Sequence, residues 1–268
     1  MISRFWVSVL KKLLSVVVRL TPNSKLADLR RLATVGWLKL NWILNNSPTG
    51  MEFSDSEKDS IIRSSKSQLG QDVLALSVKG LSQPGFFVEF GATNGFDLSN
   101  TFMLETKFGW TGILSEPARQ WHKRLKAQRN CSIDHRCVYS VTGENVGFME
   151  AKFGELSTIS GYEHGDSHSS ARDVSASYEV ETISLIDLLK IYKAPPHIDF
   201  LSIDTEGSEF EILQAFDFDQ YKFGLICVEH NYTPNRVKIF ELLSANGYER
   251  VHESLSDFDD WYVQGTNS

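Results

Sequence analysis

The segment 89–95, Glu-Phe-Gly-Ala-Thr-Asn-Gly, combines a carboxylate with two glycines. Glycines let the backbone turn sharply and approach a ligand closely. A carboxylate here would repel the pyrophosphate of a dinucleotide, but it would attract the sulfonium and ammonium groups of S-adenosylmethionine. The spacing E-x-G-x-x-x-G also differs from the G-x-G-x-x-G of dinucleotide-binding enzymes. The segment therefore favours a cationic ligand over a nicotinamide cofactor, while an ordinary glycine-containing turn would show the same residues.

Glu116 lies 21 residues beyond Gly95 and follows the apolar run 111–115. When strands alternate with helices, a carboxylate about 20 residues past the glycine loop reaches the ribose hydroxyls of a bound nucleoside. The spacing therefore predicts that Glu116 accepts hydrogen bonds from a vicinal diol. Taken alone, Glu116 could also be a surface glutamate placed before Pro117.

Acidic side chains crowd the end of a third apolar run, 198–203. Asp204 and Glu206 follow it directly, and a strand would deliver both to one edge of a sheet. Glu209 falls in the first turn of the next expected helix, where the helix dipole favours an acid, so a structural role would also explain it. The pattern predicts a proton-transfer site with Asp204 as a candidate base. Glu206 and Glu209 would orient the base or the acceptor.

Glu229 and His230 end a fourth apolar run, 223–228. His230 is therefore the second candidate base, although a structural role is as common for a histidine in such a place. The carboxylates of Asp204, Glu206 and Glu229, with the imidazole of His230, could also ligate Mg²⁺ or Mn²⁺. The favoured interpretation is a site without metal, and the divalent metal stays open as the second.

The four motifs lie in a chain whose apolar, strand-favouring runs alternate with helical patterns. This alternation predicts an α/β fold in which helices cover both faces of a mostly parallel sheet. Such sheets bind ligands beyond the carboxyl ends of their strands, where all four motifs fall. Residues 51–66 are polar and predict a linker ahead of a domain at 67–268. Residues 154–177, rich in serine, glycine and histidine, predict a mobile loop over the acceptor.

Residues 1–50 are basic, whereas the remainder of the chain is acidic. The first 50 residues hold eight bases and one acid, a charge of +7, and the remainder holds 19 bases and 33 acids, a charge of −14. The acidic body would repel phosphates, which argues against nucleic acid as a partner.

Residues 1–44 alternate apolar and basic side chains. No uncharged run there approaches the ~20 residues that span a bilayer. The pattern predicts a basic amphipathic helix on an anionic membrane surface, or a helix packed against protein. The three cysteines form no disulfide framework, which indicates a reducing compartment. We therefore expect a cytoplasmic protein, peripheral on the inner face of a membrane.

Six motifs occur in order along the chain, at 67–72, 85–92, 99–102, 109–117, 156–159 and 198–209. In this combination, residues 67–268 resemble the FkbM family of methyltransferases. The resemblance implies a Rossmann-like class I methyltransferase fold with a seven-stranded sheet, and S-adenosylmethionine as the methyl donor. It places Glu89, Gly91, Ala92, Asn94 and Asn100 around the methionine end of the donor, Glu116 at its ribose, and Cys137 and Val138 beside its adenine. Pro117, next to Glu116, is also expected to bind the donor. Members of the family more often carry aspartate, glycine, alanine and asparagine at the first motif, but the glutamate of this sequence keeps the negative charge and with it the binding role.

The resemblance further implies transfer of a methyl group to an oxygen, typically a hydroxyl of a sugar in a glycan or glycolipid. Two other functions compete with this one. A nicotinamide-dependent dehydrogenase or epimerase would need the missing G-x-G-x-x-G. A non-catalytic membrane-associated adaptor with the same fold would have lost the donor-binding residues, yet Glu89, Gly91 and Glu116 are present.

Overall fold

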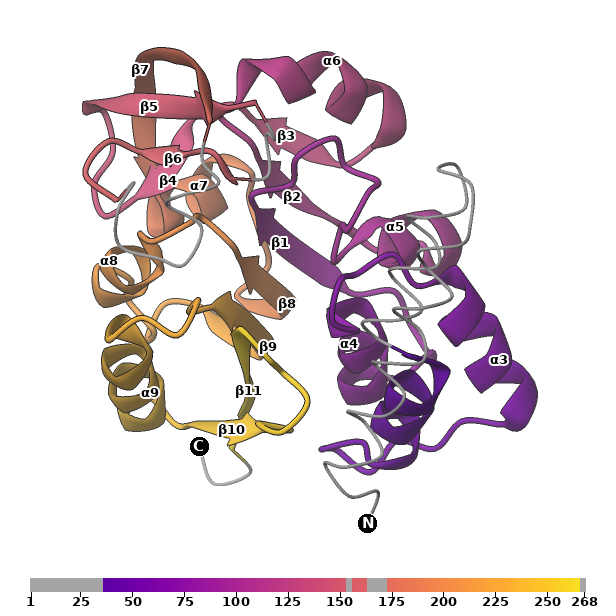
Figure 1. The fold of residues 1–268 in the computed structure, drawn as a ribbon. Coiled ribbons are helices and arrows are strands. Elements are labelled where there is room, and N and C mark those ends of the chain that lie inside the picture. Colours follow the sequence, from indigo (N-terminus) through magenta and orange to yellow (C-terminus); the bar gives the residue numbers. More distant parts are fainter. Residues whose placement is uncertain (1–35, 153–155, 163–172, 266–268) are drawn as a thin grey trace.

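A seven-stranded mixed sheet forms the centre of the computed structural model, which describes residues 36–152, 156–162 and 173–265 (Figure 1). The strand order is β10-β11-β9-β8-β1-β2-β3. Neighbours from β9 to β3 are parallel, whereas β11 runs antiparallel to both β9 and β10. The α/β prediction is confirmed, but the sheet is mixed at one edge. The strands are β1 (Phe86–Phe90), β2 (Thr111–Ser115), β3 (Ser132–Asp134), β8 (His197–Ile203), β9 (Lys222–Glu229), β10 (Tyr248–Val251) and β11 (Asp259–Gln264).

Helices cover both faces of this sheet, as predicted. Successive side chains of a strand point to opposite faces, so Phe87 and Leu114 join one core cluster while Val88 and Ile113 join the other. The first cluster takes side chains from α3 (Asp55–Ser64), α4 (Gln71–Lys79), α5 (Phe102–Phe108) and α6 (Arg119–Gln128). The second takes them from α7 (Leu185–Ile191), α8 (Glu209–Gln214) and α9 (Asn235–Ala245).

A second sheet of four strands lies beside the carboxyl ends of β1 and β2 (Figure 1) and was not predicted as a separate sheet. Its order is β4-β7-β5-β6, from β4 (Cys137–Tyr139), β5 (Asn145–Ala151), β6 (Thr158–Ile159) and β7 (Val174–Ser184). The predicted loop over 154–177 is therefore partly wrong, because β6 and the first residues of β7 fall inside it. Residues 163–172 lie outside the described residues, as do 153–155, so the predicted closure over the acceptor stays a prediction.

The predicted linker at 51–66 is wrong in part, because it contains α3. Ser54 begins this helix with a capping box to Glu57, and Ile61 and Ile62 enter the core. The division of the chain at residues 50 and 66 stays a prediction.

Residues 1–35 of the predicted basic extension lie outside the described residues. Residues 36–45 form a helix. Its Leu40, Ile43 and Leu44 pack into the core, while Trp37 and Trp42 are exposed. At least this part of the extension therefore packs on the domain with one face. Among the described helices, none has the length and apolar character that crossing a membrane requires.

Candidate functional site

A cleft of about 220 Å³ lies at the carboxyl ends of β1, β2, β8 and β9, with the small sheet along one side. Strands β1 and β8 are adjacent and parallel, so their carboxyl ends bring together segments that are far apart in the sequence. Most of the predicted site residues line this cleft, namely Glu89, Gly91, Ala92, Asn100, Glu116, Pro117, Cys137, Val138, Asp204, Glu206 and Glu229. Asn94, Glu209 and His230 do not line it.

Gly91 allows the ends of β1 and β8 to approach each other. Its φ is +73°, and a Cβ atom built on it would lie 2.1 Å from the main-chain oxygen of Asp204. No other residue type fits such a contact without moving the backbone. The glycine of the first motif thus serves the strand crossing as well as the turn.

Glu89 is engaged by protein donors. Its carboxylate accepts hydrogen bonds from the Asn100 N–H (2.7 Å), the Ser99 hydroxyl (3.1 Å) and the Thr101 hydroxyl. The guanidinium of Arg129 lies 3.7 Å away. The charge of Glu89 is therefore largely compensated within the protein. Glu89 therefore has a positioning role, in which it holds the loop at 99–101 against the cleft. The attraction of a cationic donor by Glu89 stays a prediction.

Arg129 was not singled out by sequence analysis, yet it joins three parts of this wall. Its side chain has no exposed surface and forms an ion pair with Glu105. It also donates to the Thr101 hydroxyl (2.8 Å), the Ser99 hydroxyl (3.2 Å) and the Gly95 carbonyl (3.3 Å). A basic residue at the end of α6 looks like an ordinary surface arginine in the sequence, so only its contacts reveal this role.

Asn94 builds the loop beyond the cleft. Its Oδ1 accepts the N–H groups of Phe96 and Asp97, each at 2.9 Å. This is an Asx turn, in which a side chain replaces a main-chain hydrogen bond. We therefore remove Asn94 from the residues expected to touch a donor.

Glu116 lies at the end of β2, where a ribose-binding carboxylate was predicted. Its two oxygens accept the N–H groups of Thr93 (2.7 Å) and Ala118 (2.8 Å), which fix its orientation. Burial raises the pKa of Glu116 to about 7. Each carboxylate oxygen has capacity for a second hydrogen bond, so the arrangement suits a ligand that brings two hydroxyl donors.

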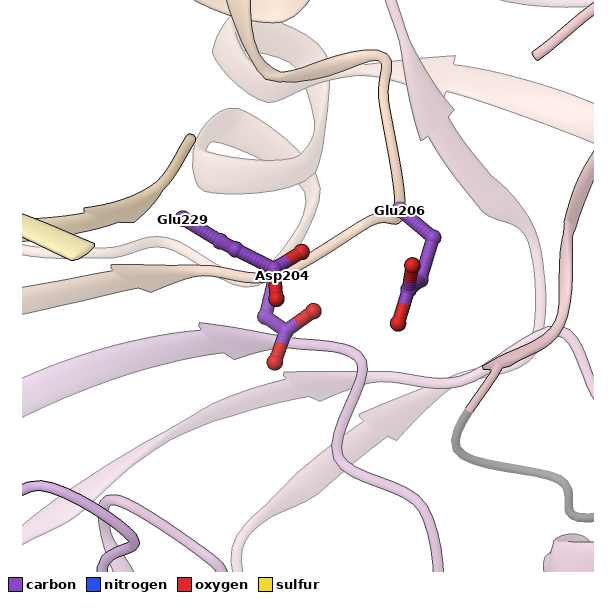
Figure 2. A group of neighbouring side chains, drawn as sticks. All are labelled: Asp204, Glu206 and Glu229. Carbon is purple, nitrogen blue, oxygen red and sulfur yellow. The ribbon is translucent and has the colours of Figure 1, made fainter. Parts of the chain in front are cut away.

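Three carboxylates face one another at the ends of β8 and β9 (Figure 2). Oxygens of Asp204, Glu206 and Glu229 all lie within 4.8 Å of one another. Burial, followed by the charge of Asp204, raises the pKa of Glu229 well above its usual value. Burial and the neighbouring Asp259 raise the pKa of Asp204 in the same way. The crowding predicted from the third motif is confirmed in space.

Asp259 and Gln71 belong to the cleft but were not among the predicted site residues. Asp259 begins β11 and lies opposite Glu229 in the antiparallel register. Its carboxylate accepts a 2.7 Å hydrogen bond from Gln71 Nε2, and burial raises its pKa to about 7. Gln71 belongs to the first of the six sequence motifs, so the sequence did indicate that it could be functional. No sequence motif contains Asp259. It reaches the cleft only because β11 pairs antiparallel with β9.

Glu209 and His230 do not line the cleft, but both line a second pocket that shares Glu229 with it. Glu209 accepts the Thr205 and Gly207 N–H groups, both at 3.0 Å, and so holds the loop between β8 and α8. His230 accepts the Tyr232 N–H at Nδ1 (3.0 Å), and its Nε2 lies 3.8 Å from Asp260. His230 Nε2 is buried without a hydrogen-bond partner. Since His230 does not line the cleft, we no longer expect it to be the base.

The free energy of unfolding should fall as the pH rises from 6.5 to 8.5. Glu116 and Asp259 have pKa values of about 7 in the folded protein because they are buried. These values lie above those of the unfolded chain, so the folded protein holds more protons in this window. For each proton that the folded protein holds in excess of the unfolded chain, the unfolding free energy falls by up to about 1.4 kcal/mol as the pH rises by one unit.

Urea unfolding at pH 6.5, 7.5 and 8.5 measures this dependence. Below pH 6.5 the opposite dependence enters, because burial lowers the pKa of His230. Asp259→Asn should flatten the profile, since one of the raised groups is gone. A profile of the wild-type protein that is flat or rises with pH would contradict the prediction.

Comparison with known proteins gives a family match that covers the cleft. The model of the methyltransferase FkbM domain matches residues 89–262. No curated protein matches. Among solved structures, the chain is similar to precorrin-6y C5,15-methyltransferase from Geobacter metallireducens GS-15, at 16% identity and a TM-score of 0.37, over 67% of this chain and 70% of that one. Since the family match spans more than half of the sequence and includes the four strand ends of the cleft, the protein belongs to the FkbM methyltransferase family.

Proposed function

We propose that the protein transfers the methyl group of S-adenosylmethionine to an oxygen, in the cleft described above. The observation that supports this most is the placement of Glu116. Its carboxylate is held by two N–H groups at the end of β2, in the cleft that Cys137, Val138 and Gly91 also line. A nucleoside whose ribose bonds Glu116 would rest its base on Cys137 and Val138. Its methionine end would then extend toward Asn100.

The reaction needs alignment and removal of one proton. The acceptor oxygen attacks the methyl carbon in line, the carbon–sulfur bond breaks, and its electron pair stays on the sulfur. A sugar hydroxyl is too weakly acidic to ionise at neutral pH, so a base must take its proton. Asp204 is the carboxylate we propose for this role. It lines the cleft, and burial and nearby carboxylates raise its pKa toward the range that suits a base.

The acceptor we propose is a hydroxyl of a sugar in a glycan or glycolipid. Support for it comes from the family resemblance and from the basic segment 1–44, which would attach the enzyme to the anionic inner face of a membrane. Within the described residues, the exposed Trp37 and Trp42 are of the type that favours a membrane–water interface. Mass spectrometry of glycolipids from cells with and without the protein tests the acceptor, since a methyl group adds about 14 mass units.

Glu116→Gln should weaken binding of S-adenosylhomocysteine by about 10- to 100-fold. A charged acceptor contributes roughly 1.5–3 kcal/mol to its hydrogen bonds, and the amide also presents a donor where an acceptor is needed. Isothermal titration calorimetry measures the affinity. Glu241→Gln, an exposed change on α9, is the control and should bind as the wild type does.

The same calorimetry separates the competing functions. A dehydrogenase or epimerase would bind a nicotinamide dinucleotide in the cleft, and an adaptor would bind neither ligand. If wild-type protein shows no heat with S-adenosylhomocysteine, the proposed function is wrong.

A further inference from the structure

Asp204 and Glu229 bring two carboxylates close together, beside the carboxylate of Glu206. Among the described residues, neither Asp204 nor Glu229 forms an ion pair with a lysine or arginine. This contrasts with Glu89 in the same cleft, which has Arg129 beside it. Like charges this close repel strongly in a poorly hydrated site. The arrangement is therefore one that a bound cation would stabilise.

One oxygen atom of Glu229 gives a second, independent indication of a bound cation. Glu229 is only 6% exposed, and its Oε2 is buried without a hydrogen-bond partner. A buried carboxylate oxygen without a partner is costly, because it has lost water and gained nothing in exchange. The side chain points at Asp204 and Glu206 (Figure 2). The missing partner therefore belongs in the space that the three carboxylates share.

We propose that Asp204, Glu206 and Glu229 bind one hard divalent cation of the Mg²⁺ or Mn²⁺ class. An all-oxygen set from two neighbouring strand ends suits these ions, which also keep several water ligands. His230, considered with this set from the sequence, is not part of it, because neither of its ring nitrogens belongs to the group of ligand atoms that lie within 4.8 Å of one another. Asn100 Oδ1 is a second buried oxygen without a partner in the same cleft and could join the outer ligands.

The role of the cation rests on the proposed function, but its binding does not. If the acceptor hydroxyl replaces a water ligand, the cation lowers the pKa of that hydroxyl and its proton passes to water in the cleft. The oxygen then attacks the methyl carbon, and neutral S-adenosylhomocysteine leaves. Asp204 would then act as a ligand instead of the base.

Mn²⁺ binding to the full chain, without donor or acceptor, tests the proposal. Electron paramagnetic resonance of free Mn²⁺ should show one bound ion per chain, displaced by excess Mg²⁺. Glu229→Gln and Glu206→Gln should each weaken Mn²⁺ binding at least about tenfold. Near-ultraviolet circular dichroism verifies that each variant is folded. If wild-type protein binds no Mn²⁺, or if both folded variants bind it as tightly as wild type, the proposal is overturned. A proton shared by the carboxylates would then explain the cluster.

Glu116→Gln is the matched control, since it removes a carboxylate charge from the same cleft but lies outside the cluster. It should keep Mn²⁺ affinity while losing affinity for S-adenosylhomocysteine, and Glu229→Gln should show the reverse. This crossed pattern separates the two proposals. Mn²⁺ binding without S-adenosylhomocysteine binding would contradict only the methyltransferase function, and the opposite result would contradict only the cation site.

Discussion

Arg129→Met should lower the free energy of unfolding by about 3–5 kcal/mol, because it leaves buried charges unpaired. The arginine side chain has no exposed surface, and it pairs with Glu105 and approaches Glu89. Methionine fills a similar volume, so the loss would come mainly from the two carboxylates that keep their burial and lose their partner. Urea unfolding monitored by tryptophan fluorescence measures the difference.

The control for this prediction is Arg124→Met on the same helix, where the side chain is exposed. It should change the unfolding free energy by no more than about 0.5 kcal/mol. Any folded Arg129→Met protein should also bind S-adenosylhomocysteine more weakly, since Ser99 and Thr101 lose a donor that holds their loop. Equal stability of the two variants would contradict the role we give Arg129.

Gly91→Ala should lower the unfolding free energy by about 3 kcal/mol or more and abolish measurable donor binding. Two effects add. A non-glycine residue at a left-handed φ costs about 1–2 kcal/mol, and the new Cβ would lie 2.1 Å from the main-chain oxygen of Asp204. Because that atom belongs to the backbone, β1 and β8 must move apart at the cleft. Unfolding in urea and calorimetry with S-adenosylhomocysteine measure the two results.

Gly143→Ala isolates the first effect. Gly143 also has a positive φ, +85°, but nothing lies within 4 Å of the position its Cβ would take. Gly143→Ala should lower the unfolding free energy only by the cost of the left-handed φ, about 1–2 kcal/mol, and should leave donor binding unchanged. If Gly91→Ala were no more destabilising than Gly143→Ala, the close approach of the two strands would not matter for stability.

Glu89 lies where the sequence predicts it, but its contacts within the protein were not predicted. The sequence places a carboxylate beside the glycine loop, and the structure puts it in the wall of the cleft. Its charge, however, is compensated by Arg129, 40 residues further along the chain. Asp204 and Glu229 line the same cleft and, among the described residues, form no ion pair with a lysine or arginine.

The sequence by itself determined the elements and which of their ends carry the site. Alternating strand and helix patterns, with apolar residues on both faces of each central strand, are local properties, and they were sufficient to predict the α/β fold and the placement of Glu116 and Asp204. The tertiary structure decided which charges are paired. Arg129 reaches Glu89 and Glu105, antiparallel β11 brings Asp259 opposite Glu229, and the segment after β9 turns His230 toward Asp260. These outcomes depend on contacts between distant segments, because a charge is compensated by whatever group folding brings beside it, and no local pattern of residues records that neighbour.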